Sequence, residues 1–274
     1  MPLHLNSITN DSQNTEVLAW ILQTAINESS GVFCTEDKRY IHMANLIYNE
    51  KTGNPIGRFV FTLFCNQAEQ RLEVLDLDIV LDNPNESKLH FLRRLPKSSD
   101  SNEYYEVEVV DKQQHLLIET VNRYTVPGVI EDTESAVRVS AFPFELSVYD
   151  SLQALNAWVG FDKVIDVGGT GLRVGGLSAD FTAPGSAFSR KDDDGNYSFV
   201  VGTVNSYEDA VVRFGQHQFA FSIIWLDTAM GTIPVAAGRE VFDLEKLEAG
   251  KVIGMNADIK CDFADYSTWH WQEG

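Results

Sequence analysis

The alternation of hydrophobic and polar residues is clearest near the end of the chain. From Ile253 to Phe263 every second residue is apolar, and the residues between them are polar or glycine. A strand that buries one face requires this period of two, whereas a helix cannot use it. We therefore predict a half-buried strand with a polar, wet opposite face. Its core-facing residues are Ile253, Met255, Ala257, Ile259, Cys261 and Phe263.

Strand patterns also cover much of the remaining chain. We expect strands at 40–48, 57–64, 72–81, 104–110, 116–122, 136–148, 163–167, 172–177, 197–214, 219–226 and 232–236. Residues 88–95 fit either a strand or a short helical turn. Pro143 cannot donate to a ladder, so it predicts an edge or a bend within 136–148.

Helical spacing is confined to three segments. Residues 12–28 carry apolar side chains three and four positions apart, with glycine just beyond the end. Residues 150–159 place Leu152, Leu155 and Trp158 on one side, with Asp150 or Ser151 as the N-cap. A short helical piece is expected near 239–247. The fold class is therefore mostly β with minor α, built from antiparallel sheets.

The order of elements between Tyr197 and Phe263 indicates a compact unit of its own. Three antiparallel strands, a helical piece and a returning strand resemble part of an OB-fold, the small Greek-key barrel. One further strand is needed, and 163–177 could supply it. The resemblance covers roughly a quarter of the chain and implies a fold but no activity. We expect a β-rich domain at 1–148 and an OB-like barrel domain at 149–274, with a helix and a glycine-rich hairpin before the barrel.

Charge narrows the range of partners. The formal net charge is −19 at pH 7, and the acidic excess is spread along the chain. A nucleic-acid binder neutralises phosphates with clustered cations, and no run in this sequence supplies more than isolated pairs such as Arg93–Arg94. We expect neither nucleic acid nor a membrane surface as a partner.

The cysteines and the first residues bear on the compartment. Cys34, Cys65 and Cys261 are widely spaced and odd in number, which favours buried thiols in a reducing environment over a disulfide framework. The first residues lack a basic region followed by an apolar run, so we expect no signal peptide. These features predict a cytoplasmic protein.

One glycine-rich stretch invites a functional interpretation. The segment Asp166 to Arg173, with sequence DVGGTGLR, resembles the first phosphate-binding hairpin of sugar kinases in the actin-like ATPase superfamily. That resemblance implies a carboxylate that organises magnesium and glycines that approach phosphate. The surrounding β pattern does not fit the α/β domain of that family, so a glycine-rich β-turn is favoured. Asp166, Thr170 and Arg173 remain candidate ligand-binding residues.

Other polar clusters favour structural interpretations. The run Asp192–Asn196 lacks the spacing of a calcium-binding EF-hand and is typical of a loop. The strand carboxylates Asp76, Asp78, Asp82, Asp258 and Asp262 are interpreted as the wet side of half-exposed strands. The histidines are never spaced as ligands of one metal ion usually are, so we expect no metal site. The sequence also offers no coherent set of catalytic groups, so we expect no catalytic residues and no cofactor.

Aromatic residues offer a possible contact surface. Tyr266, Trp269 and Trp271 lie close together in the tail, and Trp225 lies in the strand 219–226. They would bind a partner or another subunit, or else the tail packs on its own domain.

We therefore expect a non-catalytic binding or scaffold protein that acts through protein–protein contact or self-association. The alternative is an enzyme, either a hydrolase or one that processes sugars or nucleotides. Its site would lie near Asp166, Thr170 and Arg173.

Overall fold

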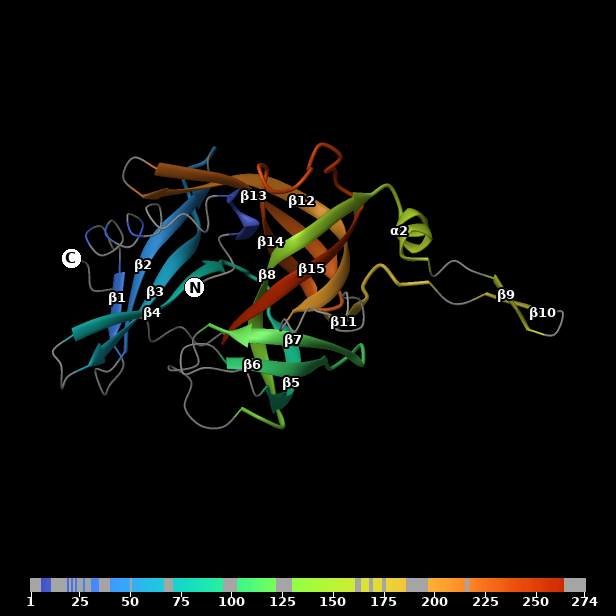
Figure 1. Ribbon diagram of the computed structural model, residues 1–274, viewed down its shortest axis with the longest axis horizontal. Helices are drawn as coiled ribbons and strands as arrows, with labels where there is room; N and C mark the ends of the chain where they lie inside the picture. The colour runs from blue at the N-terminus through green and yellow to red at the C-terminus, as the bar shows by residue number, and fades with distance from the viewer. Residues whose placement is uncertain are drawn as a thin grey trace.

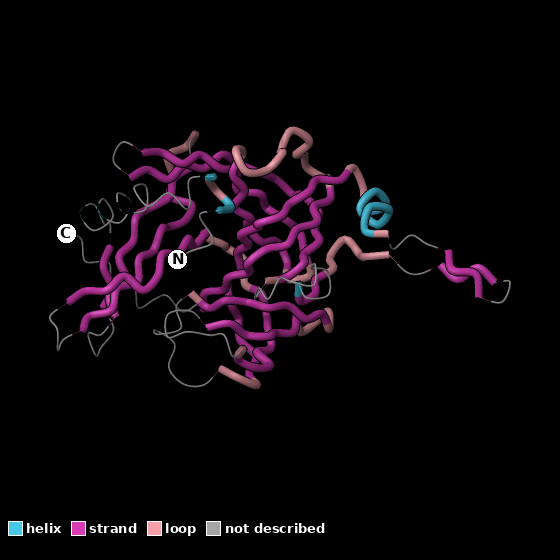
Figure 2. The backbone as a smooth tube through the Cα atoms, in the orientation of Figure 1, coloured by secondary structure: helices cyan, strands magenta, loops and turns pink. Residues whose placement is uncertain are grey.

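The computed structural model shows a mostly β protein (Figures 1 and 2). It describes residues 6–10, 31–34, 40–49, 51–66, 71–95, 103–121, 130–160, 164–167, 170–173, 176–185, 197–214 and 217–263, together with residues 19, 21, 23 and 27. The predicted β-rich fold class is therefore confirmed.

Nearly all the elements that the structure describes are strands. In chain order they are β1 (Gly31–Cys34), β2 (Tyr40–Asn49), β3 (Pro55–Asn66), β4 (Arg71–Leu81), β5 (Ser87–Arg94), β6 (Glu103–Val109), β7 (Gln114–Thr120), β8 (Thr133–Tyr149), α2 (Leu152–Val159), β9 (Val164–Val167), β10 (Thr170–Arg173), β11 (Thr182–Pro184), β12 (Ser198–Phe214), β13 (His217–Thr228), β14 (Gly231–Gly238) and β15 (Val252–Phe263).

The strands pair into two closed rings that share β8 and β15. The first ring runs from β12 through β13, β14, β8 and β15 back to β12. The second runs from β8 through β5, β6, β7 and β15 back to β8. Only the β14–β8 and β7–β15 contacts in these rings are parallel. Because each ring closes, both edges of the β8–β15 pair have hydrogen-bonded neighbours.

A single hydrophobic core passes through both rings. It contains the apolar face of β15 from Ile253 to Cys261, with Phe263 packed at its margin, as the alternation predicts. The second ring contributes residues such as Phe91 and Val107, and the first ring contributes Ile224 and Val235. The two rings therefore share one apolar interior along the β8–β15 pair.

Strands β2, β3 and β4 form an outer layer beside the rings (Figure 1). The layer joins the sheet where Ala210 and Val211 of β12 pair with Asn49 and Tyr48 of β2. A second hydrophobic core lies here, and Phe142 of β8 belongs to it. Since Phe142 alternates with Val139 and Ala141 of the first core, it points out of the rings toward the outer layer.

Several sequence expectations need correction. Residues 239–247 form turns instead of a helical piece, with Phe242 N donating to Gly238 O. The strand that completes the first ring is β8, and not the segment 163–177, which the sequence offers as one candidate. Residues 88–95 form the strand β5. The described positions within 12–28 are helical, and the rest of that segment lies outside the described residues.

The hairpin β9–β10 stands apart from the rings. In Figures 1 and 2 it lies beyond α2, at the far end of the molecule. Its two strands pair with each other in a separate two-stranded sheet. The glycine-rich stretch therefore forms a hairpin, as expected.

Candidate functional site

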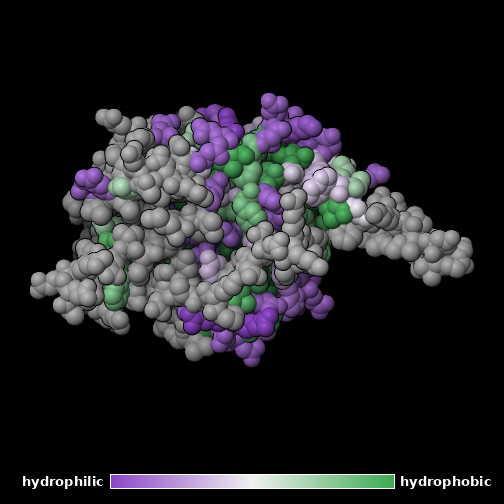
Figure 3. All heavy atoms as spheres, in the orientation of Figure 1, coloured by the Kyte–Doolittle hydropathy of each residue, from purple (hydrophilic) through white to green (hydrophobic). Residues whose placement is uncertain are grey.

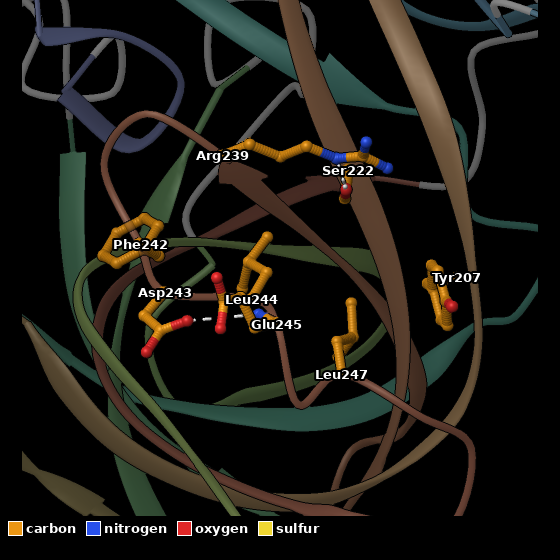
Figure 4. Close-up of a pocket in the computed structure, with 8 residues that line it drawn as sticks. All are labelled: Tyr207, Ser222, Arg239, Phe242, Asp243, Leu244, Glu245 and Leu247. Atoms are coloured by element: carbon orange, nitrogen blue, oxygen red, sulfur yellow. Dashed lines mark hydrogen bonds between the residues drawn. The ribbon is translucent and has the colours of Figure 1, made fainter.

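The surface is hollowed beside the connection from β14 to β15. The first hollow, of about 460 Å³, lies between this connection and strands β12 and β13, and we call it the Arg239 pocket (Figure 4). Phe242, Leu244 and Leu247 form its apolar part, and Phe242 and Leu247 are anchored in the main core. The connection between β14 and β15 is therefore packed against the main core where it forms the wall of the pocket.

Arg239 crosses one side of this pocket toward β13 (Figure 4). Its Nε donates to Ser222 Oγ at 3.3 Å, and its Nη2 donates to the Asp209 carboxylate. Asp209 also lies 3.7 Å from Lys51 Nζ. Since the guanidinium is already paired, it offers little attraction for a second anion.

The other charges at the pocket are acidic. The exposed carboxylates of Asp243 and Glu245 line it, and Asp243 Oδ1 accepts a hydrogen bond from the Glu245 backbone N–H at 3.1 Å (Figure 4). Tyr207 forms the facing wall and is 46% exposed. The pocket therefore suits a polar or cationic group better than a phosphate.

A second hollow, of about 380 Å³, lies between the end of β8, helix α2 and the start of β15. We call it the aromatic groove, after Phe144, Tyr149, Trp158, Phe199 and Phe242 in its lining. Phe242 also lines the Arg239 pocket, so the two hollows adjoin. Figure 3 shows hydrophobic residues gathered on this side of the molecule between the rings and α2.

Helix α2 carries Trp158 to the edge of the groove. Ser151 caps the helix by accepting from Ala154 N, and Gly160 ends it in the left-handed conformation, with φ 79°. Leu155 is the helix's buried residue and packs beside Gly254, where a Cβ would lie 2.9 Å from Leu155 Cδ1. Trp158 contacts Tyr149 with ring centroids 5.9 Å apart but is itself 70% exposed.

A β-bulge brings Phe144 to the opposite edge of the groove. Ala257 pairs with Pro143 and Asn256 with Glu145, so Phe144 has no direct partner on β15. A bulge of this kind re-aims side chains. Phe144 is 40% exposed and packs edge-on against Tyr197, with the ring centroids 4.9 Å apart. The irregularity at Pro143 confirms the predicted bend.

The polar part of the groove is held by hydrogen bonds. Asn256 Nδ2 donates to Glu145 Oε2 at 2.7 Å, which fixes an exposed carboxylate at the rim. Partial burial raises the pKa of the Tyr149 phenol, so its hydroxyl stays protonated and can donate. The groove thus combines aromatic surfaces with one oriented acid.

The most unusual charges are buried between β15 and the outer layer. Lys260 Nζ pairs with the Asp78 carboxylate and lies 3.5 Å from Glu119 Oε2. Lys260 is fully buried, and its ammonium group also lies 5.7 Å from the ring centre of Phe142. Lys260, Asp78 and Glu119 are not among the residues that line the two hollows, and they connect two packed layers.

The expectation that the polar face of β15 is wet is therefore wrong for Lys260 and Asp262, and likewise for Asp78 of β4. Burial raises the pKa of Asp262 to about 7, although Arg58 and Arg138 oppose the rise. Burial also raises the pKa of Asp258 to about 7. The outer layer, which the alternation cannot reveal, covers this face. Asp82 is exposed, and the side chain of Asp76 lies outside the described residues.

Comparisons of the chain with protein-family models, with curated proteins and with solved structures found no match. The function of this chain therefore has to be inferred from its own structure. Among the described residues, none of the helices has the length and apolarity that crossing a membrane requires.

The residues selected from the glycine-rich stretch lie on the projecting hairpin. Asp166 is paired with Gly171, Thr170 with Val167 and Arg173 with Val164. The side chains of Asp166, Thr170 and Arg173 lie outside the described residues. Ligand binding by these residues stays a prediction.

The predicted aromatic contact residues fall in different places. Trp225 packs against the second core, and its Nε1–H donates to Glu208 Oε1 at 3.2 Å. Tyr266, Trp269 and Trp271 lie outside the described residues. Of the predicted thiols, Cys261 is buried, Cys65 is partly buried, and the side chain of Cys34 is not described.

Phe144 and Trp158 are surface residues that the sequence pattern did not indicate. Trp158 shares the apolar side of its helix with Leu152 and Leu155, but Leu155 is buried and Leu152 packs against the same core, while Trp158 faces water. The signal for Phe144 was present in Pro143, since a proline inside a long strand indicates a local break that can turn its neighbour outward.

Proposed function

We propose that this protein is a non-catalytic binding protein that acts through protein–protein contact or self-association at the aromatic groove. Trp158 carries the proposal, because it is 70% exposed on a capped helix beside an apolar hollow. Tryptophan and tyrosine supply much of the energy at protein interfaces. A partner that covers Trp158 and Phe144 would remove their apolar surface from water.

The first ring supports a further structural proposal, an OB-like small barrel in which β8 serves as the fifth strand. Three consecutive strands, a connection and a returning strand lie in the expected order, and the pairing returns to β12. Small barrels of this type bind ligands on one face and on adjoining loops. The aromatic groove lies beside such a connection.

The acidity of the chain supports the remaining parts of the proposal. A net charge of −19 repels nucleic acid and anionic membrane surfaces, so protein surfaces are the favoured partners. The absence of a disulfide framework from the cysteine spacing favours the cytoplasm. The proposed activity requires no cofactor.

Molar mass measured by light scattering tests self-association. We expect the mass of the wild-type protein to rise with concentration over roughly 1–100 µM, a common range for moderate interfaces. Trp158→Ala should weaken association by about tenfold or more, because it removes an interface anchor. Tyr48→Ala is the control, since Tyr48 is an exposed aromatic residue, 39% exposed, that does not line the groove.

Equal effects of the two substitutions would contradict a role for the groove in self-association. If the wild-type protein stays monomeric, self-association is excluded and contact with a different protein remains as the proposed function. Peptides of defined chemistry test that contact.

A further inference from the structure

The two hollows adjoin at a shared wall. Phe242 lines both, and the turns from Arg239 to Leu247 separate them. A partner segment that lies in the aromatic groove and continues across these turns would reach the Arg239 pocket. Such a segment would contact both linings.

Charge on this surface has one prevailing sign. Glu145 lines the groove, and Asp243 and Glu245 line the pocket; all three are exposed. None of the three forms an ion pair within the described part of the chain. Among the described residues of the two linings, Arg239 is the single cation, and Asp209 already pairs with it.

The apolar part of the surface is suited to protein side chains. Leu146, Val241 and Met255 line the groove together with its aromatic residues. Aliphatic linings accept leucine or phenylalanine side chains more readily than the hydroxyl-covered surface of a sugar. The faces of Trp158 and Tyr149 also attract lysine and arginine through their ring quadrupoles.

We propose that the partner is a cationic polypeptide segment, with an apolar side chain in the aromatic groove and lysine or arginine residues facing Glu145, Asp243 and Glu245. This inference rests on the proposed function and specifies the chemistry of its partner. Charge complementarity raises the association rate and selects against acidic partners. The charge of −19 acts in the same direction over longer range.

Fluorescence anisotropy with three labelled peptides tests the inference. The first peptide carries Leu-Phe flanked by lysines, the second replaces the lysines with glutamates, and the third replaces Leu-Phe with two serines. We expect the lysine peptide alone to bind well. Its affinity should fall by about tenfold between roughly 50 and 500 mM salt, because exposed charges are screened.

Protein variants locate the binding. The triple variant Glu145→Gln/Asp243→Asn/Glu245→Gln should weaken binding of the lysine peptide by about tenfold at low salt. The control Glu86→Gln/Asp111→Asn/Asp132→Asn makes the same change in net charge at exposed sites away from both hollows. Trp158→Ala should weaken binding at every salt concentration.

Each contrary outcome has a defined meaning. Equal losses in the two triple variants would show general attraction to an acidic protein and overturn the inference. If the glutamate peptide binds as well as the lysine peptide, and Trp158→Ala abolishes both, the cationic partner is wrong but the proposed function stands. If Trp158→Ala affects no peptide, both proposals fail. Binding of maltoheptaose that depends on Trp158, without peptide binding, would assign a glycan and overturn the inference.

Discussion

Lys260 Nζ and the Asp78 carboxylate form a buried ion pair between residues 182 positions apart in the chain. The pair connects β15, which both rings share, to β4 of the outer layer. Glu119 of β7 lies 3.5 Å from the same ammonium group. One lysine therefore links a shared strand to the outer layer and to the second ring.

We expect Lys260→Met to lower the free energy of unfolding by about 3–5 kcal/mol, because Asp78 and Glu119 would lose the buried ammonium group that lies beside both carboxylates. Urea unfolding followed by circular dichroism measures the change. Lys88→Met is the control, since Lys88 and Glu134 form an ion pair at 2.5 Å between side chains 60% and 47% exposed. The control should lose at most about 1 kcal/mol, and similar losses in both variants would contradict the expectation.

The second prediction concerns pH. Burial raises the pKa of Asp262 from 3.8 to about 7. Between these pH values the folded protein retains a proton that the unfolded chain has lost, so the contribution of Asp262 to stability falls as pH rises. At about 1.4 kcal/mol per pKa unit, the free energy of unfolding should fall by at most about 4 kcal/mol as Asp262 ionises.

Asp262→Asn cannot ionise and should lack this decline. The measurement is the difference in unfolding free energy between the wild-type protein and the variant from about pH 4 to pH 8. Asp132→Asn is the control, because the Asp132 side chain is 93% exposed. Wild-type and Asp262→Asn curves that run parallel across this interval would show that the buried carboxyl does not titrate there.

A third prediction concerns the contact of the first residues with β14. A Cβ at Gly238 would lie 2.1 Å from the carbonyl oxygen of Ile8, a backbone atom that cannot rotate away. We expect Gly238→Ala to destabilise the fold by about 1–3 kcal/mol. Gly254→Ala is the matched control, since its nearest neighbour is the flexible end of Leu155. The melting temperature of Gly238→Ala should be well below that of Gly254→Ala. The reverse order would contradict the close contact between Gly238 and Ile8.

The fourth prediction concerns the helix that presents Trp158. Ser151 Oγ accepts from Ala154 N at 3.2 Å, so Ser151→Ala leaves a helix-terminal N–H group without its cap. The loss is expected to be about 1 kcal/mol, against a few tenths for Ser151→Gly. Hydrogen exchange of the amides in Leu152–Val159 reports the local change. Equal protection in both variants would show that the cap does not hold the helix.

Local pattern predicts the long strands well because those whose side chains are described bury at least one face. The alternation from Ile253 to Phe263 places the core residues of β15 correctly. It cannot reveal that Lys260 is buried on the other face, since that depends on Asp78 and Glu119 from distant strands. Long-range pairing also explains why β8 was not recognised as the strand that closes the first ring.

The candidate site was less accessible to sequence reasoning. Trp158 occupies a helical position that fits an apolar stripe, and only the placement of α2 beside β15 shows that its ring faces water. Phe144 depends on a bulge whose position is set by pairing with Ala257 and Asn256. Phe144 acquires its role from residues of β15 more than a hundred positions away, and Trp158 acquires its role from the packing of α2 beside Gly254.

Closure of both rings by the last described strand has a consequence during synthesis. Strand β8 ends at Tyr149, and its partner β15 begins at Val252. At ribosomal speeds of about 5–20 residues per second, β8 waits roughly 5–20 seconds for that partner. Until β15 leaves the ribosome, the nascent chain exposes an apolar strand edge, which makes it a natural client for chaperones that shield such edges.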